Sequence, residues 1–73
     1  MSADDSAVGL SGKLTLATRG AAGPGEVLLK VRGGTESYIA WSEQPLARGA
    51  GVLVISARGN REVDVMEWDD PLD

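Results

Sequence analysis

Short runs of alternating apolar and polar residues, separated by glycine-rich turns, make up most of the chain from residue 10 onward. Alternation with a period of two predicts β-strands that bury one face. No segment is long enough to predict a full helix, and residues 43–49 form a connection with at most one helical turn. The pattern therefore predicts an all-β domain whose five strands cover residues 13–18, 26–32, 35–42, 51–57 and 62–66.

The alternation also predicts which side chains point inward. In the third run Tyr38 and Ala40 share one face, so Ile39 and Trp41 take the other. The fourth run is continuously apolar, which predicts that one end of this strand is covered on both faces. Hairpin turns are expected at Gly33–Gly34 and at residues 58–61. The other predicted inward residues are Leu14, Leu16, Val27, Leu29, Val31, Val63 and Val65.

Five short strands in a chain of 73 residues favour a small closed barrel, which removes exposed sheet edges. An OB-fold-like barrel is the leading prediction, and an SH3-like barrel is the alternative. We expect one domain over residues 9–66, with disordered acidic tails at 1–8 and 67–73. The net charge is −4, but between Val8 and Met66 seven basic residues exceed five acidic ones, so the acidic character lies in the tails.

Composition excludes several classes of function. The chain has neither cysteine nor histidine, so disulfides and zinc sites of the usual ligand types are excluded. Without histidine, no side chain is an obvious base near neutral pH. No apolar run approaches the roughly 20 residues that span a bilayer. The sequence therefore predicts no catalytic residue, no cofactor and no metal site, and it favours a non-enzymatic binding module.

Ile39 and Trp41 are the strongest candidates for contact with a partner. On the outer face of a strand they would form an apolar patch, and tryptophan is frequent among residues that dominate binding energy. The alternative is that Trp41 belongs to the core or is covered by the 43–49 connection. Leu28, which breaks the alternation of the second run, and Arg32, on its outer face, are weaker candidates.

Single-stranded nucleic acid is the alternative ligand. OB-folds bind single strands through basic grooves with aromatic stacking platforms on strands two and three. Here Lys30 and Arg32 lie on the second strand, and Arg58 and Arg61 lie in a turn. The second strand has no aromatic residue, and the basic excess of the central region is only two. Nucleic-acid binding is therefore disfavoured relative to a protein partner.

The order and spacing of glycine, aromatic and aliphatic residues along the chain are similar to those of a known family. Gly12 and Gly25 open the first two strands, and the segment Tyr38-Ile39-Ala40-Trp41-Ser42 follows Gly33. Leu46 and Gly49 then precede the apolar run, Gly59 turns the chain, and Val63 and Val65 close it. Over residues 9–66 this resembles the soluble C-terminal domain of NfeD-like membrane proteins, a small five-stranded OB-fold. That family often has a polar residue where Ile39 stands.

The resemblance implies a scaffold or assembly role without catalytic residues. NfeD-like proteins are associated with membrane proteins of the stomatin, prohibitin and flotillin group, so a protein of this group is the expected partner. The resemblance also implies that membrane-spanning segments of a parent protein lie outside this chain. This domain would then be a soluble, cytoplasmic part of a membrane-associated protein, with no direct membrane insertion of its own.

Overall fold

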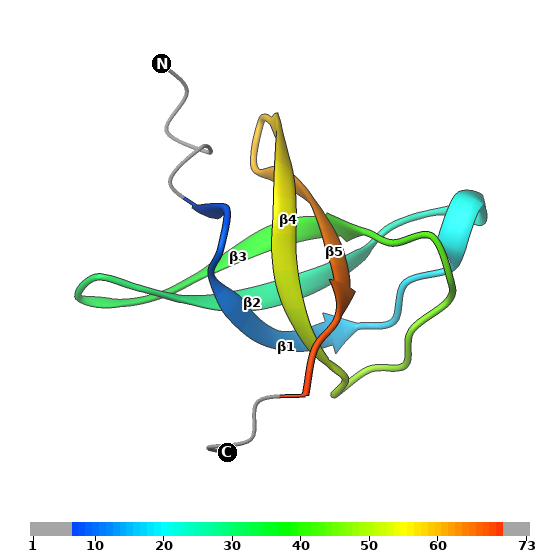
Figure 1. The fold of residues 1–73 in the computed structure, drawn as a ribbon, viewed down its shortest axis with the longest axis horizontal. Helices are drawn as coiled ribbons and strands as arrows, with labels where there is room; N and C mark the ends of the chain where they lie inside the picture. The colour runs from blue at the N-terminus through cyan, green and yellow to red at the C-terminus, as the bar shows by residue number, and fades with distance from the viewer. Residues whose placement is uncertain (1–6, 70–73) are drawn as a thin grey trace.

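The computed structural model describes residues 7–69, and five strands account for most of them. They close into a barrel in the order β1-β2-β3-β5-β4, with β1 paired to β4 (Figure 1). This confirms the predicted all-β, OB-fold-like barrel. The strands are β1 (Ser11–Leu16), β2 (Gly25–Val31), β3 (Gly34–Trp41), β4 (Gly51–Gly59) and β5 (Glu62–Glu67). One short 3-10 helix, η2 (Gly20–Ala22), lies between β1 and β2.

The barrel interior is filled by the inward residues of all five strands. Tyr38 and Ala40 are buried as the alternation predicts, which leaves Ile39 outside with 40% of its surface exposed. Valine dominates the core because a β-branched side chain packs well on a pleated sheet. The buried apolar residues are Ala7, Leu14, Val27, Leu29, Tyr38, Ala40, Val52, Val54, Val63 and Val65.

A β-bulge accounts for the one predicted inward residue that is exposed, and a second bulge changes the outer face of β4. The β1–β2 register shifts between Leu14 and Leu16, so Leu14 is buried while Leu16 is 57% exposed. The β4–β5 register also shifts between Val54 and Ser56, so Ser56 lies outward beside Asp64 although alternation from the buried Val54 would place it inward. Ile55, which follows Val54, is 49% exposed. Each bulge inserts one extra residue, and the following side chains change face. β4 is therefore not covered on both faces around Ile55.

The two hairpins turn through residues with positive φ. Between β2 and β3 the loop is Arg32–Gly33, with Gly33 at a φ of +87°. Arg32 thus lies in this turn and not on the outer face of β2, where the sequence placed it. Between β4 and β5 the loop is Asn60–Arg61, with φ values of 53° and 60°. Two successive positive φ values match the type I′ turn, whose twist suits a hairpin.

The described structure extends past the predicted domain limits at both ends. Ala7 is buried in the core, and the Gly9 amide donates to the Val54 carbonyl at 2.9 Å. At the other end the Trp68 amide donates to the Gly51 carbonyl at 2.8 Å. The remaining residues of the predicted tails, 1–6 and 70–73, lie outside the described residues. Within residues 7–69 no helix is long and apolar enough to cross a membrane.

Candidate partner-binding site

The parallel pairing of β3 with β5 places three side chains side by side on the outside of the barrel. Trp41 is in register with Asp64, and Asp64 is in register with Ser56 of β4. Their neighbours Ala40 and Val63 are buried and in register with each other. Because successive residues of a strand alternate between faces, Trp41 and Asp64 both face outward. Closure of the barrel thus assembles a row across three strands.

Asp64 is held by charged and neutral donors from β4. The Arg58 guanidinium donates to Asp64 Oδ1 from Nε at 3.0 Å and from Nη2 at 2.7 Å. The Ser56 hydroxyl donates to Asp64 Oδ2 at 2.7 Å. The hydrogen bonds from Arg58 lower the pKa of Asp64, and those from Ser56 lower it further, against an opposing effect of burial. Bonding to Asp64 likewise raises the pKa of Arg58, so both groups stay charged at neutral pH.

Trp41 is fixed between Arg58 and Glu62. The Arg58 guanidinium carbon lies 4.6 Å from the centre of the Trp41 ring, within the range of a cation–π contact. The Trp41 indole Nε1 donates to Glu62 Oε1 at 2.8 Å. Trp41 is half-buried, and its ring lies on the outer face, not in the barrel core. It is therefore an oriented surface aromatic.

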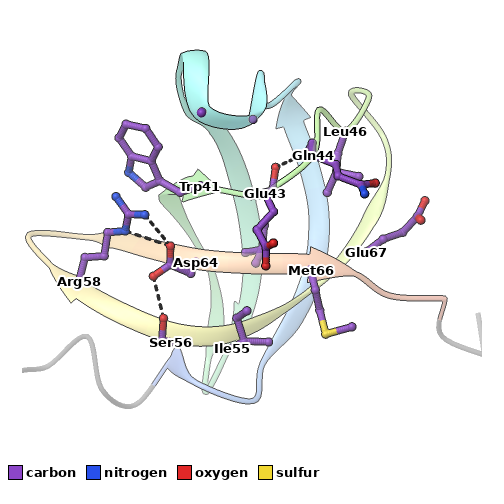
Figure 2. A pocket seen from close by; sticks show the side chains of 14 residues that line it. Trp41, Glu43, Gln44, Leu46, Ile55, Ser56, Arg58, Asp64, Met66 and Glu67 are labelled. Atoms are coloured by element: carbon purple, nitrogen blue, oxygen red, sulfur yellow. Dashed lines mark hydrogen bonds and ion pairs between the residues drawn. The ribbon is translucent and has the colours of Figure 1, made fainter.

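A groove of about 730 Å³ runs from Trp41 along the outer face of β4 and β5. Figure 2 shows Trp41 and Arg58 at one end of it and Met66 and Glu67 at the other. Ile55 and Met66, which are 49% and 47% exposed, lie along its β4–β5 side. Its opposite wall comes from η2 and from residues 42–46. The groove thus combines an oriented aromatic with two exposed aliphatic side chains.

Thr18 fixes the wall formed by residues 42–46. This threonine is only 2% exposed, and its hydroxyl accepts the Leu46 amide at 2.8 Å. The Ser42 hydroxyl lies 2.6 Å from the Thr18 hydroxyl and 2.6 Å from the Gln44 carbonyl. The Thr18 amide in turn donates to the Leu46 carbonyl at 2.9 Å. These bonds hold a non-helical connection in one position against the end of β1.

The charge of the groove is predominantly negative. Of its described lining residues, Arg58 is the one cation, and it is bound to Asp64. Glu43 and Glu67 also line the groove, and both are exposed. Glu62 lies beside the Trp41 end, where it accepts the indole hydrogen bond. A ligand that complements this groove would therefore be apolar with basic flanks.

The four sequence-predicted contact residues do not form one patch. Trp41 lines the groove, and Ile39 is its exposed neighbour on β3, in register with Glu62. Leu28 lines a different groove, together with Lys13 and Trp68. Arg32 lies in the β2–β3 turn, at the opposite end of β3 from Trp41, about 25 Å away along the strand. Figure 1 shows this hairpin projecting away from η2.

Sequence reasoning missed two apolar residues of the groove and one ion pair. Met66 could have been found, since the strict alternation of residues 62–66 places it on the same face as Asp64. Ile55 could not, because its run is continuously apolar and shows no alternation that would tell outward from inward residues. The Arg58–Asp64 pair follows from hairpin register. The sequence alone assigned Arg58 to a turn.

Comparison with known proteins agrees with this architecture. The family model of the NfeD C-terminal domain matches residues 11–66. Among solved structures, the soluble domain of the NfeD protein YuaF from Bacillus subtilis is similar, with a TM-score of 0.76 and 32% sequence identity. That match covers 90% of this chain and 79% of the YuaF chain. No curated protein matches the chain. By the match over residues 11–66, this chain belongs to the NfeD C-terminal domain family.

Proposed function

We propose that this domain is a non-enzymatic interaction module of an NfeD-like, membrane-associated protein, and that it docks a protein partner of the stomatin, prohibitin or flotillin type. The observation that carries this proposal is the groove in which Trp41, Ile55 and Met66 line one continuous surface. A partner segment with a row of apolar side chains would pack this row against Ile55 and Met66. The acidic flanks, Glu43 and Glu67, favour basic residues beside the row.

Burial of the exposed apolar surface supplies the main attraction. Ile55 and Met66 each expose about half of their surface, and covering that half contributes about 1 kcal/mol per residue. Trp41 adds a large aromatic surface of the kind that dominates interface energies. Its orientation is already fixed by Arg58 and Glu62, so little side-chain entropy is lost when a partner binds.

The electrostatics of the groove support binding over catalysis. The pKa of Asp64 is lowered and that of Arg58 is raised, so each shift favours the charged form. A catalytic base or acid needs a pKa moved toward neutrality instead. The Arg58–Asp64 pair therefore suits a structural role, in which it orients Trp41.

The binding test uses the 73-residue chain and the purified soluble domain of a stomatin-type protein from the same organism. We expect partner addition to shift the backbone resonances of Trp41, Ile55 and Met66 in a two-dimensional NMR titration. Ile55→Ser combined with Met66→Ser should weaken binding about tenfold to a hundredfold, since two half-buried contacts are lost. Trp41→Ala should weaken binding and leave the fold intact.

Leu16→Ser is the matched control, because Leu16 is 57% exposed on β1 and does not line the groove. Binding should be unchanged in this variant. Equal losses for Leu16→Ser and for the groove variants would refute a specific site. If Trp41→Ala unfolds, Trp41 is needed for stability. If the partner shifts only resonances outside the groove, docking takes place elsewhere on the barrel.

A further inference from the structure

A second groove, of about 370 Å³, lies on the outer face of β1 and β2. Lys13 is in register with Leu28 across the β1–β2 pair and with Gly51 across the β1–β4 pair. Trp68 joins them because its amide donates to the Gly51 carbonyl just after β5 ends. Lys30 lies two residues beyond Leu28, so it shares the same outer face of β2. Barrel closure thus gathers two lysines, a leucine and a tryptophan from distant parts of the sequence.

This groove is basic although the whole chain carries a net charge of −4. None of the described residues that line it is acidic. Exposed hydroxyl side chains complete the lining, from Thr15 on β1 and Thr35 on β3. Acidic residues border the groove: Glu26 Oε1 lies 3.3 Å from the Thr15 hydroxyl, and Glu67 and Asp69 flank Trp68 in the sequence. The surface is therefore a local cationic patch with acidic borders.

Large apolar side chains are exposed within the cationic patch. Trp68 is 40% exposed and Leu28 is 38% exposed, and both line the groove together with the lysines. Tryptophan and lysine are the residues that favour the headgroup level of a bilayer, where an apolar ring and a cation both find partners. Leucine adds an aliphatic group for the boundary between headgroups and acyl chains.

We propose that this face is a contact site for a bilayer surface that contains anionic phospholipids. Lys13 and Lys30 would bind lipid phosphates, and Trp68 and Leu28 would enter the headgroup region. Arg32, exposed in the adjoining β2–β3 turn, adds a third cation beyond Lys30. The contact is peripheral, because the patch offers two apolar side chains and no spanning segment.

The composition of the face favours lipid over single-stranded nucleic acid. Single-strand binding relies on several aromatic rings on which successive bases stack. Here Trp68 is the one aromatic residue among the described lining residues, and its apolar companion is aliphatic. Leu28 cannot stack with a base, but it can be buried among acyl chains.

This inference is independent of the protein-docking groove. The two grooves share no described lining residue. Trp41 lines the first groove, and Trp68 lines the second. The two proposals therefore rest on different residues. Failure of either proposal does not decide the other.

The test follows the fluorescence of Trp68 in a Trp41→Phe variant, in which Trp68 is the only tryptophan of the chain. The probes are phosphatidylcholine vesicles with or without phosphatidylglycerol, carrying bromine on the acyl chains, at low ionic strength. We expect a blue shift and quenching with the anionic vesicles only. Lys13→Gln combined with Lys30→Gln should lower the partition coefficient about twenty-fivefold, at about fivefold per lysine near an anionic surface.

Arg19→Gln combined with Arg48→Gln is the matched control, because it removes the same charge from exposed residues outside the groove. Partitioning should fall much less in this variant, and thermal unfolding confirms that both double variants fold. Equal losses in the two double variants would overturn the proposal, as would equal quenching by neutral vesicles. Lysine-dependent quenching by an oligothymidine, without any by anionic vesicles, would assign the face to nucleic acid instead.

Discussion

The guanidinium of Arg58 lies 4.6 Å from the centre of the Trp41 ring while two of its nitrogens bind one carboxylate oxygen of Asp64. One side chain of β4 therefore orients an aromatic of β3 and a carboxylate of β5. The β3–β5 pair that closes the barrel spans only three register pairs, and Trp41–Asp64 is one of them. The side chains of the candidate site are thus carried by the strand pair that closes the barrel.

The first prediction concerns the pH dependence of stability through Asp64. Because its pKa is lower in the folded state than its ordinary value of 3.8, ionised Asp64 stabilises the fold above that value. The contribution is lost as pH falls through the folded-state pKa. The stability difference between the wild-type protein and Asp64→Asn should be constant from neutral pH to about 5 and should shrink below pH 3.8. Urea unfolding at several pH values measures it.

Carboxyl NMR titration provides the control for this prediction. The pKa of Asp64 should rise toward its ordinary value in Arg58→Gln, and it should rise less in Ser56→Ala, because Arg58 has the larger effect. An Asp64 that titrates at its ordinary value in the wild-type protein would contradict the assigned bonds. If the pKa of Asp64 stays low in Arg58→Gln, a group other than Arg58 causes the shift.

Period-two alternation made much of the barrel predictable from the sequence. Tyr38, Ala40, Val63 and Val65 are all buried where the pattern places them, because a strand that faces a core must alternate. The bulges were not predictable, since one extra residue reverses the exposed face without any change of composition. Leu16 is exposed for this reason.

The candidate sites were less predictable than the strands because they depend on register and closure. Trp41 was placed on the outer face correctly, but its partners Arg58 and Glu62 come from another hairpin. Trp68 follows β5 in a segment that the sequence assigned to a tail. Its place beside Lys13 and Leu28 follows from one backbone hydrogen bond to Gly51. Such long-range contacts leave no local signal.

The second prediction tests the anchor of the groove wall. Thr18→Val keeps the shape of the side chain but leaves the Leu46 amide without its hydroxyl acceptor. An unsatisfied buried donor costs about 1–3 kcal/mol, so the free energy of unfolding should fall by about that amount. Amide hydrogen exchange at Leu46 should also become faster. Denaturant unfolding and hydrogen exchange measure the two effects.

Thr15→Val is the matched control, because Thr15 is exposed on β1 and its bonds to Glu26 are long, at 3.3 Å. Its stability should change by less than about 0.5 kcal/mol. Similar losses in both variants would mean that a general effect of replacing threonine by valine, rather than loss of the Thr18 bond, lowers the stability.

The third prediction concerns the closest approach of β1 to β2. A Cβ at Gly12 would lie 2.1 Å from the Leu28 carbonyl oxygen, so Gly12→Ala requires the two backbones to separate. Overpacking against backbone destabilises by about 3 kcal/mol or more, a large part of the stability of a small domain. Gly34→Ala is the control, because nothing lies within 4 Å of its added Cβ and its φ is not in the left-handed region. Thermal unfolding compares the two, and equal melting temperatures would contradict the close packing of β1 on β2.

The last prediction concerns the turn that joins β4 to β5 and so presents Arg58 to Trp41. Asn60 has a φ of 53°, which asparagine tolerates and alanine resists. Asn60→Ala should therefore lower the free energy of unfolding by about 1 kcal/mol, whereas Asn60→Gly should change it little, because glycine adopts positive φ readily. Gly59 pairs with Glu62 across this turn, and Arg58 directly precedes Gly59. Strain in the turn should therefore also weaken the Arg58–Trp41 contact. Tryptophan fluorescence of Trp41 in a Trp68→Phe background would report that change. Equal stability of the alanine and glycine variants would show that the turn is not type I′ in solution.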